Sequence, residues 1–340
     1  MNRKTILYFA PLEGITNYTY RNVHCACYPG LDAYFSPFLS PNQHHAINPK
    51  EKKDILPENN TGVPLIPQVL TNKPEYFLAT ARELKELHGY EEVNLNLGCP
   101  SKTVVSKGKG SGFLAETEKL ERFFEEVFEE IEKVDGAASV TGGQADCVYP
   151  RISVKTRLGM LNADDFVTLL ELYNRYPLSE LIIHPRVQKD FYKNSPNLEA
   201  FADAVRVSRH SLCYNGDICT FSDYLKVRER FPTVEKMMIG RGLLANPELG
   251  MEIQAYEARA ACGEAWNGYT VSKEKIKKYH DLLYDRYVER MSGDTNVLFK
   301  MKELWVFLGA QFPEEEKLLK KIKKATGLEE YEKLVGEMFK

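Results

Sequence analysis

Eight short apolar segments recur along the first 240 residues, and most are separated by stretches with the spacing of amphipathic helices. The expected strands are Ile6–Ala10, Ala33–Phe35, Pro64–Val69, Glu92–Leu97, Ile152–Thr156, Leu181–His184, Leu212–Asn215 and Lys236–Ile239. The expected helices between them include Pro74–His88, Thr117–Lys133, Ala163–Tyr176, Leu198–Ser208 and Phe221–Phe231. Alternation of buried strands and covering helices is typical of a parallel sheet, and eight repeats favour a closed (β/α)8 TIM barrel over an open sheet.

Two segments fit this pattern less well. The connection 36–63 is rich in proline and asparagine and only weakly helical. Residues 134–150 have many small side chains and no period, which predicts an irregular surface loop or a short hairpin before the fifth strand.

The pattern changes after residue 245. A helix at Glu248–Cys262 and a loop at Gly263–Thr270 lead into four helical segments with no strand between them, at 273–292, 296–309, 314–325 and 329–339. Their apolar face is supplied by Leu282, Leu283, Leu298, Met301, Leu304 and Trp305. These segments predict a C-terminal all-α helical bundle, so we expect two domains, a barrel at residues 1–250 and a helical domain at 263–340.

The amino-acid composition indicates the general class of protein. The 340 residues are 43% hydrophobic and 27% charged, as in an ordinary globular protein. No stretch approaches the roughly 18 uninterrupted apolar residues of a membrane helix, and the apolar run near the N-terminus is too short for a signal peptide. We therefore expect a cytoplasmic protein with no membrane partner.

The seven cysteines are scattered, and Cys25 and Cys27 stand only two positions apart. This spacing is poor for a structural zinc site, so we expect free thiols and no metal.

Charge is distributed unevenly. The net charge is −3, but residues 273–340 hold 15 Lys and Arg against 13 Asp and Glu, which is +2 and leaves −5 for residues 1–272. The basic run Lys317–Lys324 lies in this tail. Two interpretations stay open for it, a solvated helix face and a contact with RNA phosphates.

Nearly every expected strand ends in polar or glycine-containing residues. These ends are Pro11–Gly14, Gln68, Asn96–Pro100, Lys155–Arg157, His184–Arg186, Asn215–Asp217 and Gly240–Gly242. In a TIM barrel the loops after the strands meet at one mouth, where active sites are assembled. Polar groups from seven separate loops are hard to explain as core packing, so the sequence predicts a functional site at this mouth.

The last two strand ends favour a phosphate-bearing cofactor. Asn215-Gly216-Asp217 and Gly240-Arg241-Gly242 combine a cation with glycines whose backbone can approach phosphate oxygens closely. The run Gly108–Gly112 looks like a dinucleotide-binding loop but lacks the strand–turn–helix context of that motif.

Seven runs stand in the order in which they occur in the tRNA-dihydrouridine synthases. They are A-P-L-E-G-I-T-N (10–17), V-N-L-N-L-G-C-P-S-K (93–102), K-G-K-G-S-G (107–112), V-K-T-R-L-G (154–159), I-H-P-R (183–186), Y-N-G-D-I (214–218) and I-G-R-G (239–242). The chain resembles this family strongly over residues 5–250 and by architecture beyond them. The resemblance implies an FMN-binding barrel and a helical tRNA-binding domain. It also implies reduction of the C5=C6 bond of tRNA uridines with NAD(P)H, for which NADPH is the expected reductant.

The resemblance also assigns site residues by position. Flavin contacts are expected from Pro11, Leu12, Glu13, Gln68, Lys155, His184, Asn215, Gly216, Asp217, Gly240 and Arg241. Lys155 would stabilise the negative charge of the reduced flavin. The uridine and its phosphates would meet Asn96, Lys107, Arg157 and Arg186. Asn17 and Asn94 stand where the family commonly has aspartate.

Cys99 is the expected catalytic residue. Hydride addition at C6 of uracil leaves carbanion character at C5, which must be protonated. A thiol with a pKa near 8.5 is mostly protonated at neutral pH and is acidic enough to supply that proton. A buried structural cysteine is the plainer alternative, but the position after the fourth strand, inside N-L-G-C-P, favours the acid.

Two other functions compete with this interpretation. A flavin barrel enzyme acting on a free small molecule, similar to dihydroorotate dehydrogenase, also places a cysteine near the flavin but has no need of a helical domain after residue 270. A non-catalytic tRNA-binding or RNA-chaperone protein would keep the bundle without the polar strand ends. We expect the protein to be a monomer whose partners are tRNA and NAD(P)H.

Overall fold

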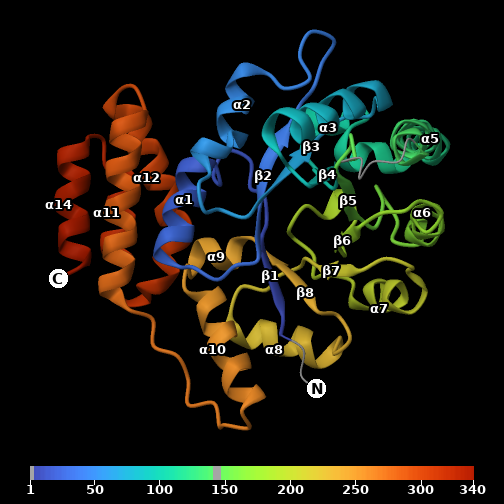
Figure 1. Ribbon diagram of the computed structural model, residues 1–340. Helices are drawn as coiled ribbons and strands as arrows, with labels where there is room; N and C mark the ends of the chain where they lie inside the picture. The colour runs from blue at the N-terminus through green and yellow to red at the C-terminus, as the bar shows by residue number, and fades with distance from the viewer. Residues whose placement is uncertain (1–3, 141–146) are drawn as a thin grey trace.

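The computed structural model describes residues 4–140 and 147–340, and its centre is a closed barrel of eight parallel strands (Figure 1). Neighbours in the barrel follow chain order, and β8 pairs with β1 to close it. The strands are β1 Ile6–Phe9, β2 Ala33–Leu39, β3 Leu65–Val69, β4 Glu92–Leu97, β5 Arg151–Arg157, β6 Glu180–His184, β7 Leu212–Tyr214 and β8 Lys236–Ile239. The predicted TIM barrel is therefore confirmed.

Helices follow most strands and then continue without strands to the C-terminus. Those around the barrel are α1 Tyr18–Cys27, α2 Pro49–Ile55, α3 Pro74–His88, α4 Lys102–Val105, α5 Thr117–Val140, α6 Asp165–Tyr173, α7 Leu198–Val207, α8 Phe221–Arg230, α9 Arg241–Ala245 and α10 Leu249–Ala261. The helices after the barrel are α11 Lys273–Arg290, α12 Asp294–Leu308, α13 Glu316–Lys324 and α14 Leu328–Met338. The four predicted C-terminal helices are thus present within about two residues at each end. None of the helices among the described residues is long and apolar enough to cross a membrane.

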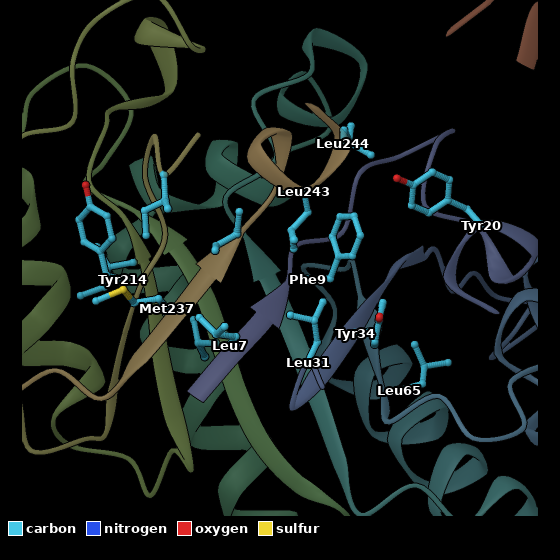
Figure 2. Close-up of a cluster of buried hydrophobic side chains, with 14 of the residues drawn as sticks. Leu7, Phe9, Tyr20, Leu31, Tyr34, Leu65, Tyr214, Met237, Leu243 and Leu244 are labelled. Carbon is cyan, nitrogen blue, oxygen red and sulfur yellow. The ribbon is translucent and has the colours of Figure 1, made fainter. Parts of the chain in front are cut away.

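The two faces of each strand form two separate hydrophobic layers because successive side chains point to opposite sides. Residues such as Tyr8, Phe35 and Met238 pack together inside the barrel. Their neighbours Leu7 and Phe9 face outward, where they are at most 1% exposed among the surrounding helices (Figure 2). The same alternation brings the last inward positions of the strands to the barrel mouth.

Two segments differ from the sequence prediction. Strand β2 runs to Leu39, beyond the predicted end at Phe35, and its pairing with β3 shifts register between Phe35 and Phe38, so the strand continues past an irregularity. Helix α5 continues through Val140, so the predicted loop or hairpin at 134–150 is wrong for its first seven residues. Gly136 is tolerated there because one glycine costs a helix only about 1 kcal/mol. Residues 141–146 lie outside the described part of the chain.

The connection 36–63 is held by a buried arginine on α1. The Arg21 side chain is almost fully buried and its Nη1 donates to Asp54 Oδ2 at 2.9 Å and to Thr16 O at 2.8 Å. Its Nη2 donates to Asn60 Oδ1 at 2.9 Å and to the Asp54 carbonyl. One side chain thereby ties α1 to the C-terminal end of α2 and to the turn that follows it, and it satisfies the Asp54 carbonyl group.

Replacing Arg21 should therefore be costly. We expect Arg21→Ala to lower the free energy of unfolding by about 3–5 kcal/mol, because Asp54 and the buried carbonyl groups lose their partner. Urea unfolding of the flavin-free protein measures this. Arg122→Ala, at an exposed position on α5, is the control and should change stability by less than about 0.5 kcal/mol. Equal stability of the two variants would contradict the role of Arg21.

The C-terminal helices pack directly on the barrel beside α1 and α9 (Figure 1). Tyr279 of α11 meets Tyr20 of α1 with ring centroids 6.2 Å apart, and Gln311 Nε2 donates to the Ala245 carbonyl at 2.9 Å. Lys300 of α12 donates to the carbonyl of Gly14 in the loop after β1. This last contact places the N-terminal half of α12 at the edge of the barrel mouth.

Candidate active site

A pocket opens at the barrel mouth between the ends of β1, β5, β6, β7 and β8. It is lined by Ala10, Pro11, Leu12, Lys155, His184, Tyr192, Asn215, Gly216, Asp217, Ile218, Cys219, Met238, Gly240, Arg241 and Gly242. Nine of the eleven residues assigned to the flavin from the sequence are in this lining. The other two, Glu13 and Gln68, lie outside it.

The glycines on the phosphate side are required by close packing. A Cβ on Gly242 would stand 2.2 Å from the carbonyl oxygen of Ile218, and one on Gly216 would stand 2.9 Å from the Tyr214 hydroxyl. Gly240 presents bare backbone to the pocket, 3.4 Å from the Ala10 methyl measured from its ideal Cβ position. The loops after β7 and β8 thus pack closely enough to form a cradle of backbone groups, and larger residues at Gly216 or Gly242 would push these loops apart.

Asp217 joins two arginines at this cradle. Arg186 pairs with both carboxylate oxygens, with Nη1 to Oδ1 at 2.9 Å, and Arg241 Nη2 donates to the same Oδ1 at 2.7 Å. Asp217 adopts a φ of 40°, which a non-glycine residue rarely does without a functional constraint. Arg186 is only 2% exposed, so it reaches the pocket through Asp217 and His184.

His184 is uncharged in this setting. Arg186 Nη1 lies 2.9 Å from His184 Nε2, and a guanidinium can only donate, so Nε2 accepts and the proton of the ring is on Nδ1. Burial and then the cations Arg157 and Lys155 hold the pKa of His184 well below its ordinary value. The ring therefore offers the pocket a neutral polar surface.

Tyr192 is a pocket residue that the sequence analysis missed. Its ring lies 4.6 Å from the Arg241 guanidinium carbon and 5.6 Å from that of Arg157, and 5.9 Å from the His184 ring. The side chain is 48% exposed, so it forms the outer wall of the pocket. Its position in the loop after β6 was the one available signal, and an aromatic residue in a loop is too common to be informative by itself.

Lys155 brings an uncompensated cation into the barrel. Among the residues that the structure describes, none accepts a hydrogen bond from its Nζ or forms an ion pair with it. Burial and the charge of Arg157 lower the pKa of Lys155 to about 8. A half-buried ammonium group without a partner at a pocket wall is suited to a ligand that presents anionic or acceptor atoms.

A row of amides lies beside Lys155. Asn96, which is opposite Lys155 in the β4–β5 pairing, donates through Nδ2 to Gln68 Oε1 at 2.7 Å. Gln68 Nε2 donates to Asn94 Oδ1 at 2.8 Å, and Asn94 Nδ2 donates to Ser153 Oγ at 3.0 Å. Gln68 is completely buried by these contacts.

Cys99 follows β4 in a loop that is held from two sides. Its backbone N–H donates to Asn96 Oδ1 at 2.9 Å. Its carbonyl accepts from the Ser111 backbone N–H at 3.1 Å and from Ser111 Oγ at 2.8 Å. Burial raises the pKa of the half-buried Cys99 thiol, so the sulfur carries its proton at neutral pH.

The K-G-K-G-S-G run supports this loop. Gly110 has a φ of 56°, and a Cβ there would lie 2.9 Å from the Cys99 carbonyl oxygen and 3.0 Å from the Cys99 Cβ. The glycines of the run therefore allow residues 110–112 to pack against the Cys99 loop. This packing gives the run a structural role in place of the dinucleotide binding that its glycine spacing suggests.

This packing leads to a prediction for Gly110. We expect Gly110→Ala to cost about 1–3 kcal/mol of stability, because the left-handed backbone and the contact with Cys99 both become strained. Alkylation of Cys99 in the folded protein, followed by mass spectrometry, should become several-fold faster as the loop shifts. Gly336→Ala is the control, since nothing lies within 4 Å of its Cβ position in α14. An unchanged alkylation rate in Gly110→Ala would contradict this assignment.

The remaining predicted residues are not gathered in the pocket. Arg157 is 1% exposed and donates to the carbonyls of Gly98, Val187 and Phe191, at 2.9, 3.1 and 3.1 Å. Its guanidinium thus ties the loops after β4 and β6 together. Lys107 is exposed beside the Cys99 loop, and Glu13 is exposed on the rim. Partial burial and the carboxylates Glu51 and Asp54 raise the pKa of Glu13.

Comparison with known proteins gives the family. A family model described as "Dihydrouridine synthase (Dus)" matches residues 8–338. A "Probable tRNA-dihydrouridine synthase" of Staphylococcus epidermidis is 28% identical over 246 residues, which are 70% of this chain and 68% of the relative. A "Probable tRNA-dihydrouridine synthase 2" of Bacillus subtilis is 27% identical over 247 residues, which are 70% and 69% of the two chains.

Solved structures share the fold at low identity. Histamine dehydrogenase from Rhizobium sp. 4-9 has a TM-score of 0.54 at 11% identity, over 81% of this chain and 48% of that one. A 2-naphthoyl-CoA reductase has a TM-score of 0.52 at 10% identity, over 76% of this chain and 50% of that one. These likenesses show the fold alone, whereas the family model matches almost the whole chain, barrel and C-terminal helices together. The chain therefore belongs to the dihydrouridine synthase family and is a flavin-dependent oxidoreductase.

Proposed function

We propose that this protein reduces the C5=C6 bond of uridines in tRNA to give 5,6-dihydrouridine, with FMN as its flavin and NADPH as the reductant. One observation carries the proposal: Asn96 lies between the backbone of Cys99, whose thiol is protonated, and Lys155, a cation without an anionic partner among the described residues. Its Oδ1 accepts the Cys99 N–H at 2.9 Å, and it stands opposite Lys155 in the β4–β5 pairing. Reduction of a carbon–carbon double bond beside a carbonyl needs both a proton donor and a stabilised negative charge.

The residues present fit a flavin mononucleotide. Gly216, Gly240 and Gly242 line the pocket with backbone, and the close packing at Gly216 and Gly242 brings the loops after β7 and β8 together, as a phosphate site requires. Arg241 at the pocket edge supplies a cation there. Lys155 also lines the pocket, where it would donate to the acceptor atoms of the isoalloxazine ring and stabilise the negative charge that the ring gains on reduction.

Each residue then has a defined task. A bound, reduced flavin supplies the hydride for C6 of uracil. Cys99 holds a proton on Sγ and delivers it to C5, and burial keeps the thiol protonated until then. Lys155 orients and stabilises the cofactor. Arg157 and Arg186 hold the loops around the mouth through the carbonyl and Asp217 contacts described above.

We assign the tRNA body to the helical part, residues 263–340. Helix α12 lies at the rim of the mouth through its contact with Gly14, and its Phe299 side chain is 64% exposed. The lysines of Lys317–Lys324 are exposed on α13, while Ile322 is buried. Exposed lysines with an aromatic residue suit RNA phosphates and bases, and a uridine must leave its stack to reach the barrel.

The test is an assay of the purified, FMN-loaded protein with NADPH. We expect dihydrouridine to form in unmodified tRNA, detected by mass spectrometry of nucleosides, and no turnover of dihydroorotate. Turnover of dihydroorotate alone would contradict the proposal. RNA binding without any flavin-dependent turnover would instead favour a non-catalytic RNA-binding protein.

A further inference from the structure

The amide row beside Lys155 has a direction that can be deduced from its first contact. The backbone N–H groups of Gly98 and Cys99 both donate to Asn96 Oδ1, at 3.0 and 2.9 Å. A backbone N–H can only donate, so the Asn96 oxygen must face the Cys99 loop and its NH2 group must face Gln68. The orientation of the Asn96 amide is therefore fixed, because neither backbone N–H group can accept a hydrogen bond.

Every later contact then has one possible sense. Asn96 Nδ2 donates to Gln68 Oε1, so Gln68 Nε2 is the donor to Asn94 Oδ1. Asn94 Nδ2 in turn donates to Ser153 Oγ. The row therefore runs from the Cys99 loop through three side-chain amides to a hydroxyl on β5, and reversing any member would place two donors or two acceptors together.

The far end of this row is isolated from any substrate. Asn94 and Ser153 are both 0% exposed, and neither lines the pocket at the mouth. Gln68, which the sequence assigned to the flavin ring, is also 0% exposed in this protein. Asn94 and Ser153 thus act on the site only through Gln68 and Asn96.

We propose that Asn94 and Ser153 are positioning residues, which hold the Gln68 amide in one orientation and, through Asn96, hold the Cys99 loop in place. The part of this proposal that concerns turnover rests on the proposed function. Three amides with a shared direction exclude the flipped state of Gln68, in which its nitrogen would face the Asn96 NH2 group and its oxygen would face the Asn94 oxygen.

Two substitutions at position 94 separate positioning from simple stability. Asn94→Leu has similar bulk and removes both hydrogen bonds. Asn94→Asp accepts from Gln68 Nε2 and from a rotated Ser153 hydroxyl, so it keeps the direction of the row. If Asn94→Leu does not fold, Ser153→Ala removes the terminal acceptor and takes its place in the same measurements.

The first readout uses flavin-free protein and needs no activity. The rate of iodoacetamide alkylation at Cys99 is followed by mass spectrometry, with the exposed Cys147 of the same molecule as the internal reference. We expect Asn94→Leu to raise the Cys99 rate relative to Cys147 about 3-fold or more, because the loop opens more often. Asn94→Asp should stay within about 2-fold of the wild-type protein.

The second readout is steady-state turnover with tRNA. We expect Asn94→Leu to lower kcat on the order of 10-fold while KM for tRNA stays within about 2-fold, and Asn94→Asp to restore kcat. The inference is overturned if the leucine variant leaves either the alkylation rate or kcat unchanged, or if the aspartate variant is as impaired as the leucine variant. If Asn94→Leu changes the alkylation rate of Cys99 but the wild-type protein does not reduce tRNA, the proposed function is wrong, and the coupling of Asn94 to the Cys99 loop still stands.

Discussion

Cys99→Ala protein should bind FMN as tightly as the wild-type protein and form dihydrouridine at least about 100-fold more slowly. Loss of a general acid typically costs 10²–10⁴ in rate, and no other thiol lines the same loop. The sulfur is not among the residues of the pocket that holds the phosphate side, so its removal leaves that cradle unchanged. Single-turnover reduction of tRNA by pre-reduced enzyme measures the chemical step directly.

Cys147→Ala is the matched control, because this cysteine is exposed and remote from the mouth. It should react at the wild-type rate. If Cys99→Ala also reduces uridine at the wild-type rate, another group protonates C5, and Cys99 is a packing residue of the loop. Loss of flavin binding in Cys99→Ala would likewise contradict the assignment of proton transfer to Cys99 and of cofactor binding to the loops after β7 and β8.

Lys155→Met protein should bind FMN on the order of 100-fold more weakly than the wild-type protein. The Lys155 ammonium group is held in the pocket without an anionic partner among the described residues, so the acceptor atoms of a bound flavin ring gain a charge-assisted hydrogen bond that no protein group already uses. Methionine keeps the length and the apolar stem of the side chain, so the loss reports on charge. Fluorescence titration of the flavin-free protein with FMN gives the dissociation constant.

The wild-type affinity should also depend on pH in a defined direction. The pKa of Lys155 is about 8 in the flavin-free protein, and a hydrogen-bond acceptor bound beside the charged amine raises that pKa. Between about pH 7 and 8, where the phosphate of FMN is already fully charged, FMN affinity is therefore level, and above pH 8 it falls by up to about tenfold per pH unit until the pKa of the complex is reached. Lys155→Met should lose this dependence, whereas Lys226→Met, on the exposed side of α8, should retain it. A pH profile shared by all three proteins would assign the titration to another group.

The pattern of apolar and polar residues was sufficient to predict the barrel and most of the residues at its mouth. Strands β4 and β8 and helix α3 lie at the predicted bounds, because their apolar positions follow a period of 2 or 3.6 residues that is visible without tertiary contacts. Helix α5 was predicted seven residues too short, since Gly136 and small side chains weaken the pattern where the helix nevertheless continues.

The pocket could be predicted because of a general property of the fold. All eight strands of a parallel barrel end at the same mouth, so polar residues that follow separate strands must meet there. Nine residues assigned by position do line one pocket. Their order in the chain also carried the family resemblance that the family model then established.

The sequence by itself determined the architecture, the family and the place of the pocket at the barrel mouth, because these depend on periodicity and on short runs of residues. Only the tertiary structure decided what holds the site together. The Arg21–Asp54 pair, the Tyr192 wall, the Gly110–Cys99 packing and the directed amides from Asn96 to Ser153 each join segments far apart in the chain. Such contacts leave no periodic trace, since a single hydrogen bond or one close approach specifies its two partners only after folding has brought them together.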